Sequence, residues 1–312
     1  MDSYTIVVPD AGVLSCVCGT NDSNLKLIEE HLGVPVFTRG NELSVDEEDP
    51  VVREKFRFII DRILDEIKDG GENGADIVAS VLNTESRPSL APYAIAVPGG
   101  FRKLYPRTEN QACYIGMLRK RELVLCTGPA GSGKTFLAVA EALRLALSHN
   151  KSKLILTRPV VEAGESLGYL PGDLEQKLNP YLRPLYDAME SVLPRETVRR
   201  LVESGVIETA PLAYMRGRTL NNSVIILDEG QNTTREQMKM FLTRMGENSK
   251  MFITGDVTQI DLPHRRESGL VHALGLLKSI EEIGTMTFTA EDVVRAPLVK
   301  KIVRAYENEK QE

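Results

Sequence analysis

The sequence has little that would place it in a membrane or outside the cell. None of its apolar runs is long enough to span a bilayer. Its first residues lack the basic segment and the apolar core of a secretory signal. We therefore expect no membrane partner and a cytoplasmic location.

Cysteines are also few. The four are Cys16, Cys18, Cys113 and Cys126; they form no C-x-x-C pair, and no histidine stands at zinc-ligand spacing from them. Because Cys126 lies inside an apolar run, we interpret it as a small core residue. The sequence thus predicts neither a disulfide framework nor a metal site of the zinc type.

Excess positive charge is absent as well. The formal net charge is −6, which argues against a broad surface that binds nucleic acid by charge alone and leaves room for a local basic groove. The rest of the composition is ordinary. A chain of 312 residues, 42% hydrophobic and 26% charged, is typical of a globular protein with a sizeable core. Its length favours about two domains.

One stretch of the sequence is rich in glycine. Residues 128–135 follow the apolar run 123–126 and precede a helically spaced pattern over 136–147, so they lie at a strand-to-helix turn. There the pattern G-x-x-x-x-G-K-T predicts a loop whose backbone N–H groups bind a triphosphate. We expect Lys134 to reach the β- and γ-phosphates and Thr135 to hold Mg²⁺. The expected nucleotide-binding residues of this loop are Gly128, Pro129, Ala130, Gly131, Ser132, Gly133, Lys134 and Thr135.

A pair of carboxylates follows a second apolar run. Residues 224–227 predict a buried strand that ends in Asp228 and Glu229, which places both acids at the carboxyl edge of a parallel sheet, beside the phosphate loop. We expect Asp228 to hold Mg²⁺ directly or through water, and Glu229 to polarise the attacking water. Lys134 and Glu229 are therefore expected catalytic residues, and Thr135 and Asp228 are the expected metal ligands.

More polar residues are expected around the nucleotide. Gln231 follows the two carboxylates, and the apolar run 251–253 leads into Thr254, Asp256 and Gln259. Polar side chains at this edge would lie near the γ-phosphate and sense whether it is present. Asp256 has an alternative role as the cap of a following helix.

Gln111 precedes the phosphate loop by one short helix. A glutamine in this place can accept a hydrogen bond from the adenine amino group and donate one to N7. The chain also has no Asn-Lys-x-Asp element of the guanine-binding type. We therefore expect the nucleotide to be ATP.

The first third of the chain differs from the rest. We expect residues 1–68 to form a small α+β unit like a KH domain, with strand 4–8, helix 25–32, strands 34–38 and 42–45, and helix 51–67. Residues 69–107 are rich in Gly, Pro, Ser and acids and are expected to be a linker. A KH module binds nucleic acid through a G-x-x-G loop. The equivalent loop here, Gly19 to Asp22, ends in an acid, so RNA binding and a docking role both stay open.

Residues 108–312 alternate strand-like apolar runs with helical patterns, which is typical of a parallel sheet with crossover helices. We expect strands at 122–127, 153–157, 206–210, 223–227, 251–255 and 285–289. The first, second, fourth and fifth are apolar enough to lie in the centre of the sheet. The expected fold is therefore α/β: a P-loop NTPase core of RecA-like type with a small N-terminal KH-like domain.

Taken in order, these motifs resemble those of the PhoH-like ATPases. The similarity extends from Leu25 to the C-terminus. Its most specific segments are TRPVVEAGE (157–165), LGYLPGD (167–173), APLAYMRGRTL (210–220) and QMKMFLTR (237–244). The resemblance implies an ATPase core related to superfamily 1 helicases, a role in RNA metabolism and association with an rRNA-processing endoribonuclease. The chain departs from the family pattern at Gly230, where Ala is usual, and at Ala296, where His usually follows Arg295.

The related helicases bind ATP between two RecA-like domains, and the second domain supplies arginines to the γ-phosphate. This chain has room for one such core, so we expect a neighbouring subunit to supply the arginine in a homo-oligomeric ring, a hexamer. Arg295 is the first candidate for this catalytic arginine, and Arg265 and Arg266 are the second.

We therefore expect a Mg²⁺-dependent ATPase that binds and remodels RNA. Arg216 and Arg218 are the preferred RNA contacts among a larger set of basic candidates: Arg158, Lys177, Arg183, Arg216 and Arg218. The alternative is a nucleotide-gated assembly factor for an endoribonuclease or a ribosomal partner, without unwinding activity. A small-molecule kinase is disfavoured because no acceptor-binding lid is evident.

Overall fold

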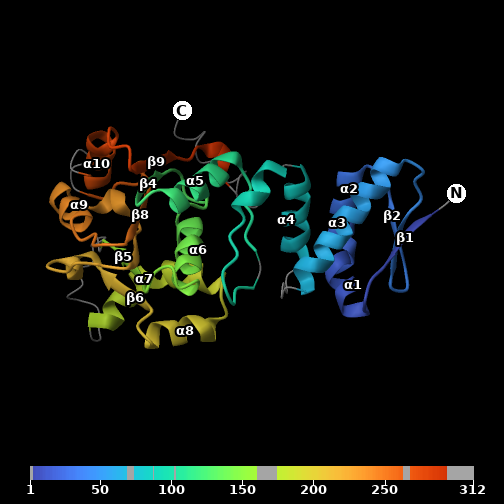
Figure 1. Cartoon of the computed structure of the whole chain (residues 1–312), viewed down its shortest axis with the longest axis horizontal. Helices are drawn as coiled ribbons and strands as arrows, with labels where there is room; N and C mark the ends of the chain where they lie inside the picture. The colour runs from blue at the N-terminus through green and yellow to red at the C-terminus, as the bar shows by residue number, and fades with distance from the viewer. Residues whose placement is uncertain are drawn as a thin grey trace, which may run out of the picture. The chain divides into compact units, whose positions relative to one another are not determined.

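The computed structural model describes residues 3–68, 74–86, 88–101, 103–159, 174–262 and 268–293. The chain forms two compact units, residues 1–109 and 110–312. Each unit has its own sheet and its own core (Figure 1).

The first unit is an α+β structure. Its elements are β1 (Tyr4–Val7), α1 (Ala11–Cys18), α2 (Ser23–Leu32), β2 (Val36–Arg39), β3 (Glu42–Val45), α3 (Pro50–Lys68) and α4 (Gly74–Ser86). The three strands form an antiparallel sheet in the order β1-β3-β2. Gly33 ends α2 in a left-handed conformation, with φ of 75°. Gly40, with φ of 62°, lies in the turn between β2 and β3.

The core of this unit brings residues of α1, α2, α3 and α4 together. Phe56, Ile59, Ile60 and Ile63 of α3 are fully buried, because their spacing places them along one face of the helix. Ile77, Val78, Val81 and Leu82 of α4 join the same apolar cluster, together with residues of α2.

Residues 74–86 were expected to belong to a linker, and that expectation was wrong. They form α4, whose apolar face packs against α1, α2 and α3. A second helix that the sequence analysis did not predict, α1, lies between β1 and the expected helix α2. Further along, Ile95 and Leu104 pair as an isolated antiparallel bridge.

The second unit contains the remaining helices and strands. They are α5 (Glu109–Lys120), β4 (Leu123–Thr127), α6 (Lys134–Leu147), β5 (Lys153–Arg158), α7 (Leu174–Glu190), α8 (Arg195–Glu203), β6 (Ile207–Pro211), β7 (Ser223–Leu227), α9 (Arg235–Leu242), β8 (Lys250–Gly255), α10 (Gly269–Leu277) and β9 (Ile283–Thr287).

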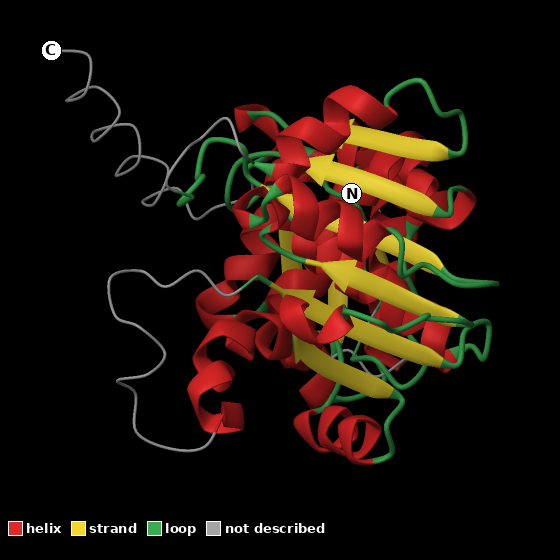
Figure 2. Cartoon of the chain, turned by 90° about the vertical axis from the view of Figure 1, so that its left-hand side faces the viewer, coloured by secondary structure: helices red, strands yellow, loops and turns green. Residues whose placement is uncertain are grey.

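These six strands form one parallel sheet in the order β6-β5-β7-β8-β4-β9. In Figure 2 the arrows of these six strands point in one direction, so their carboxyl ends meet at one edge. The four strands expected in the centre, β4, β5, β7 and β8, are the four interior strands. The α/β P-loop fold is therefore confirmed. The last strand, β9, begins and ends two residues earlier than expected.

Both faces of the sheet are covered by helices. Side chains of a strand point alternately to its two faces. Leu125, Ile225 and Ile253 lie in a cluster with residues of α9 and α10. Helix α6 packs against β5, β7 and β8, and the alternate residues Val124 and Ile226 are also fully buried. Strands covered on both sides in this way are apolar throughout, which is why they were readable from sequence.

No helix in the parts of the chain that the structure describes is long and apolar enough to cross a membrane.

Candidate functional site

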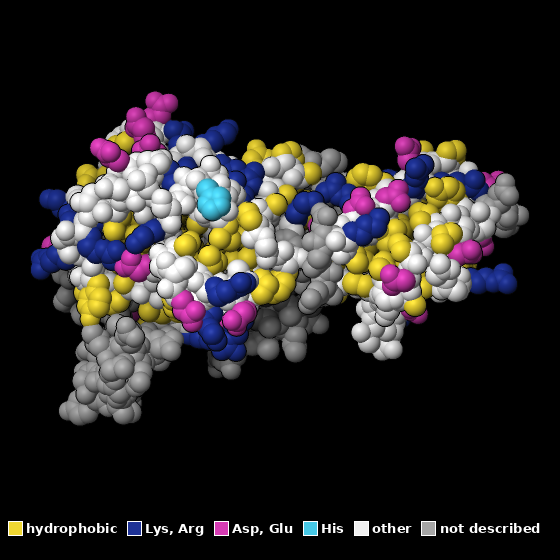
Figure 3. All heavy atoms as spheres, turned by 60° about the horizontal axis from the view of Figure 1, so that its bottom comes forward, with side chains coloured by type: hydrophobic (Ala, Val, Ile, Leu, Met, Phe, Trp, Pro, Cys, Tyr) yellow, Lys and Arg dark blue, Asp and Glu magenta, His cyan; other side chains and the backbone are white. Residues whose placement is uncertain are grey.

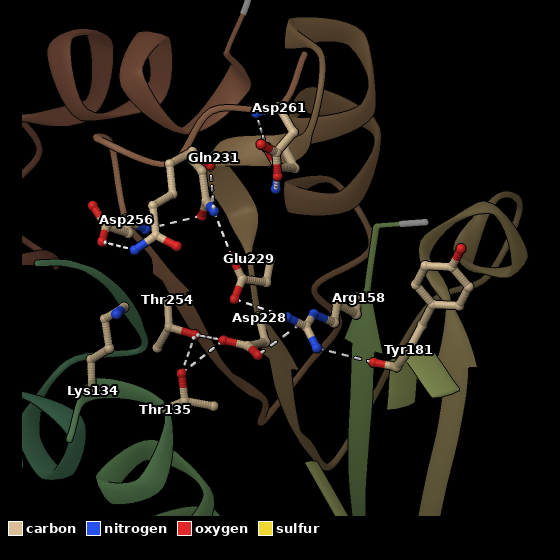
Figure 4. A network of polar contacts seen from close by, with 12 residues as sticks. Lys134, Thr135, Arg158, Tyr181, Asp228, Glu229, Gln231, Thr254, Asp256 and Asp261 are labelled. Carbon is tan, nitrogen blue, oxygen red and sulfur yellow. Dashed lines mark hydrogen bonds and ion pairs between the residues drawn. The ribbon is translucent and has the colours of Figure 1, made fainter. Parts of the chain in front are cut away.

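The expected site residues come together at the carboxyl edge of the six-stranded sheet. Strand β8 lies between β4, which leads into the phosphate loop, and β7, which leads into Asp228 and Glu229. The parallel register aligns the ends of these strands, so residues far apart in sequence lie within hydrogen-bonding distance (Figure 4).

The phosphate loop has the backbone that its glycines predict. Gly131 and Gly133 have φ of 84° and 85°, in the left-handed region that favours glycine. Gly128 fits close to β9, because a Cβ there would lie 2.6 Å from Cβ of Phe288. The N-cap residue of α6 is Gly133, which has no side chain to cap the helix, so the amide groups of the first turn can bind an anion. Lys134 Nζ donates to the carbonyl of Pro129 at 3.3 Å, which holds the ammonium over the loop.

Three oxygen-bearing side chains converge beside the loop. Thr135 Oγ1 donates to Asp228 Oδ1 at 2.7 Å, and Thr254 Oγ1 donates to the same oxygen at 2.8 Å. Asp228 is 6% exposed and Thr254 is fully buried. Oxygen donors with a single carboxylate suit Mg²⁺, which keeps several waters and takes phosphate oxygens as further ligands. Within the described part of the chain no three His, Cys, Asp or Glu residues are grouped to hold a metal by themselves.

Glu229 lies next to this corner in a strained backbone conformation. Its φ of 54° and ψ of 37° are in the left-handed region, which is uncommon for residues other than glycine and occurs at functional sites. Its carboxylate forms an ion pair with Arg158, whose Nη2 lies 2.8 Å from Oε1. Arg158 Nε also lies 3.9 Å from Asp228 Oδ2. One guanidinium therefore faces both carboxylates of the Asp-Glu pair.

The expected γ-phosphate sensors form one network. Gln231 is fully buried; its Nε2 donates to Glu229 Oε2, and its Oε1 accepts from the amide of Asp256 at 3.0 Å. Gln259 Nε2 donates to Asp256 Oδ2 at 2.7 Å. Burial disfavours the charge of Asp256, but hydrogen bonds from Thr258 and Gln259 and the charge of Lys134 outweigh it, so the pKa of Asp256 lies below its usual value.

Asp256 was considered as a γ-phosphate sensor and as the cap of a following helix; its side chain closes a turn, and the sensor role stays a prediction. Its Oδ1 accepts from the amide and the hydroxyl of Thr258, at 2.9 and 2.7 Å, which closes a turn after β8. Its backbone is at the same time tied to Gln231. The residue therefore shapes the loop that connects β8 to the site.

Gln111 lies against the phosphate loop. It is 5% exposed, and its Nε2 donates to the carbonyl of Ser132 at 3.0 Å. Gly133 leaves room for it, since a Cβ there would lie 3.2 Å from Gln111 Nε2. The contact with adenine stays a prediction.

The arginines considered as partners of phosphate or RNA fall into several groups. Arg295, Arg265 and Arg266 lie outside the described residues, as does the side chain of Lys177. Arg183 pairs with Asp187 and Glu190 on its own helix, α7. Arg218 pairs through both terminal nitrogens with Glu208, at 2.5 and 2.9 Å, and this hydrogen bonding holds the pKa of Glu208 below its usual value. Arg216 is exposed.

Arg158 was expected among the basic candidates for RNA contact, whereas the structure places it beside Asp228 and Glu229. The position of Arg158 follows from the alignment of strands β5 and β7. Thr157 pairs with Leu227 in the register of β5 and β7, so Arg158, the last residue of β5, and Asp228, the residue after β7, lie side by side. To predict that register one must know which strands are neighbours. A local pattern of residues does not contain this information.

The family follows from sequence comparison. Residues 103–307 match the model of the family described as PhoH-like protein. This chain belongs to the PhoH-like family. A PhoH-like protein of Bacillus subtilis is 46% identical over 301 residues, which cover 93% of each chain. A PhoH-like protein of Synechocystis is 42% identical and covers 97% of this chain and 94% of its own. Protein PhoH of Escherichia coli is 44% identical over 64% of this chain and 57% of its own.

Among solved structures, the large terminase of a thermophilic bacteriophage aligns with a TM-score of 0.40 and 12% identity, over 63% of this chain and 49% of that chain. This similarity is too low to support an argument about function. The resemblance to the PhoH-like family is confirmed by the sequence relatives, and the site geometry is that of a P-loop NTPase.

The departure at Gly230 has a packing reason. A Cβ at this position would lie 2.9 Å from Cγ2 of the buried Ile253 and 3.3 Å from the carbonyl of Thr254. An alanine here requires β8 to move by a few tenths of an ångström. Ala296, the second departure, lies outside the described residues.

Proposed function

We propose that this PhoH-like protein is a Mg²⁺-dependent ATPase whose hydrolysis is coupled to binding or remodelling of RNA. The observation that supports it best is the meeting of Thr135, Asp228 and Glu229 beside the phosphate loop, at distances set by the parallel sheet. A nucleotide-binding loop with no carboxylates beside it would be enough for a protein that stores a nucleotide or is regulated by one. A loop joined to a paired Asp and Glu has the groups that water attack on a γ-phosphate requires.

Each part of the site has a separate task in this proposal. The loop amides and Lys134 hold and neutralise the phosphates. Thr135 and Asp228 would hold Mg²⁺, which supplies positive charge to the phosphate oxygens when bound. Glu229 orients a water for in-line attack and takes its proton. Gln231 forms hydrogen bonds with both Glu229 and the backbone amide of Asp256. A movement of Glu229 when the γ-phosphate is lost is therefore transmitted to the end of β8.

The choice of ATP over GTP depends on Gln111 and on the lack of a guanine-recognition element in the sequence. Gln111 is held beside Ser132 and Gly133, in the part of the loop that leads into α6. An amide side chain offers both a donor and an acceptor, which is the pattern that the adenine edge requires.

RNA is proposed as the polymer on the basis of residues that follow β6. Tyr214 is 52% exposed and Arg216 is exposed, and both follow the carboxyl end of a strand, at the same edge as the nucleotide site. An exposed aromatic ring two residues from an exposed arginine is suited to stacking on a base and pairing with a phosphate. In Figure 3, acidic and basic side chains are interspersed on the visible face, which fits a local contact better than a broad basic surface.

The test is ATP turnover with and without single-stranded RNA. Glu229→Gln should bind ATP and lose turnover by about a thousandfold, because the amide cannot take a proton. The matched control is Glu282→Gln, an exposed glutamate before β9, which should turn over ATP like the wild type.

Polyuridylate should raise the wild-type rate, and Tyr214→Ala should reduce that increase.

Two results would contradict parts of the proposal. Full turnover by Glu229→Gln would exclude Glu229 as the base. Stimulation by a protein partner, with no response to RNA, would favour the assembly factor over the RNA-remodelling enzyme.

We also propose that the site is completed by a neighbouring subunit in a hexameric ring, with Arg295 as the arginine at the γ-phosphate. The described residues form one core of this type, and catalytic arginines of P-loop enzymes are often supplied in trans. Arg295→Ala and Glu229→Gln should each be inactive alone. Mixed together, they should regain activity, because about a quarter of the interfaces in a random ring combine two intact halves. Failure to regain activity in rings that have exchanged subunits would exclude the shared site.

A further inference from the structure

The catalytic carboxylate of the proposed ATPase is held at both of its oxygens. Arg158 Nη2 lies 2.8 Å from Glu229 Oε1, and Gln231 Nε2 donates to Oε2. The side chain of Glu229 is 33% exposed and that of Arg158 is 20% exposed, so the ion pair is partly shielded from water. Figure 4 shows the carboxylate lying between the two partners.

Arg158 reaches Glu229 from a fixed position. It is the last residue of β5, and the register with β7 sets its backbone beside Asp228. Its Nη1 donates to the main-chain carbonyl of Tyr181 in α7, at 3.1 Å. The planar guanidinium thus links the Asp-Glu pair on one side to helix α7 on the other.

In this arrangement both oxygens of the carboxylate have protein partners, Arg158 on one and Gln231 on the other. The ion pair and the hydrogen bond together fix the direction in which the carboxylate points. The left-handed backbone of Glu229 and the hydrogen bond from Gln231 keep the side chain in place. For full activity the carboxylate must turn from Arg158 toward the water.

We propose that Arg158 is a positioning residue that restrains Glu229 in a resting state and releases it when α7 moves. This inference rests on the proposed function, in which Glu229 is the base. Helix α7 packs against β5 and against α6, the helix that begins at the phosphate loop. Displacement of α7 removes the carbonyl of Tyr181 from Arg158, and the guanidinium then leaves Glu229. Helix α7 thereby controls the rate of hydrolysis.

The alternative is that Arg158 only stabilises two neighbouring carboxylates. The two roles predict opposite changes in rate. A residue that restrains the base slows basal hydrolysis, so its removal raises kcat. A residue that assembles the site supports hydrolysis, so its removal lowers kcat.

The experiment measures kcat and KM for basal ATP hydrolysis by the full chain. Arg158→Ala should raise kcat about fivefold and leave KM within about twofold, as expected for the loss of one partly shielded ion pair. Arg158→Lys keeps the charge but loses the second donor that reaches Tyr181, so its kcat should lie between those of the wild type and Arg158→Ala. Arg199→Ala is the matched control, because Arg199 also pairs with two glutamates, Glu196 and Glu203, on the exposed helix α8.

Two further measurements keep this inference separate from the proposed function. In a Glu229→Gln background, Arg158→Ala should leave the residual rate unchanged, because it acts through Glu229. Circular dichroism and ATP binding report whether the variants fold. A folded Arg158→Ala variant that binds ATP with an unchanged or lower kcat would overturn the restraint. Full activity of Glu229→Gln alone would instead overturn the assignment of the base.

Discussion

Two turns in this chain begin with a glycine and lead into a helix. One is the phosphate loop, residues 128–133 before α6, and the other is residues 19–22 before α2. In the first, every residue with positive φ is a glycine: Gly128, Gly131 and Gly133. In the second, Gly19 is followed by Asn21 and Asp22, whose φ values are 53° and 56°. The same backbone region is thus occupied by glycine in one turn and by polar side chains in the other.

The difference lies in what each turn offers to an anion. The phosphate loop presents backbone amides with Lys134 above them, so both its dipole and its charge attract phosphate. The turn at 19–22 ends in the exposed carboxylate of Asp22. Backbone shape alone therefore does not make a phosphate site; the charge beside the turn decides it.

The largest expected effect comes from breaking the phosphate loop. Lys134→Ala removes the ammonium that neutralises the β- and γ-phosphates and should lower kcat/KM for ATP by about a thousandfold. Lys26→Ala is the matched control, because Lys26 is an exposed lysine on α2, beside the other turn. Steady-state kinetics at several Mg²⁺ concentrations would measure both. Equal losses from the two variants would contradict the contrast between the turns.

The next effect concerns a residue that supports the metal corner from within the sheet. Thr254→Val keeps the shape of a fully buried side chain and removes the hydroxyl that donates to Asp228 at 2.8 Å. The Mg²⁺ concentration for half-maximal ATPase rate should rise about tenfold, as is typical when a partner of a metal ligand is lost. Thr285→Val, on the edge strand β9, serves as the control. An unchanged Mg²⁺ requirement in Thr254→Val would show that the hydroxyl does not position Asp228.

More of the site than of the first unit could be predicted from the sequence. Asp228, Glu229 and Gln231 directly follow an apolar strand, and strands buried on both faces are visible as continuous apolar runs. Their carboxyl ends must share an edge in a parallel sheet, so the functional residues could be grouped without knowing the strand order. The contact of Arg158 with Glu229 needed that order, and it was missed.

The first unit has short elements with weaker signals. Helix α1 has only eight residues and no charged face, although Asp10 caps it by accepting from the amide of Val13. Helix α4 has a readable apolar spacing at Ile77, Val78, Val81 and Leu82, but it is surrounded by glycines, prolines and acids. Its stability comes from packing on α3 and on α1 and α2, of which the last two are distant in sequence.

The role of α4 can be tested at its first residue. A Cβ on Gly74 would lie 2.0 Å from the carbonyl oxygen of Cys16, so α1 and α4 approach each other at a distance that only glycine allows. Gly74→Ala should therefore destabilise the first unit by about 2 kcal/mol, measured by urea unfolding. Gly275→Ala in α10, where a Cβ meets no atom within 4 Å, should be neutral or stabilising. An unchanged midpoint for Gly74→Ala would mean that α4 does not pack on α1.

The smallest expected effect comes from converting the second turn toward the first. Asp22→Gly restores the G-x-x-G pattern, relieves a left-handed backbone and removes a negative charge. If the first unit binds RNA through this turn, affinity for polyuridylate should rise about threefold at low salt, and the gain should shrink as salt screens the charge. Fluorescence anisotropy of labelled RNA, with the full chain, measures both.

Two companion variants separate charge from backbone in this experiment. Asp22→Asn keeps a residue that tolerates the left-handed region and removes only the charge, so it should show most of the gain if repulsion is the cause. Asp61→Asn removes an exposed carboxylate on α3, which pairs with Arg57, and should change RNA affinity little. A similar gain from Asp61→Asn would point to net charge in place of the turn. No gain from either substitution of Asp22 would indicate that residues 19–22 do not contact RNA, which favours a docking role for the first unit.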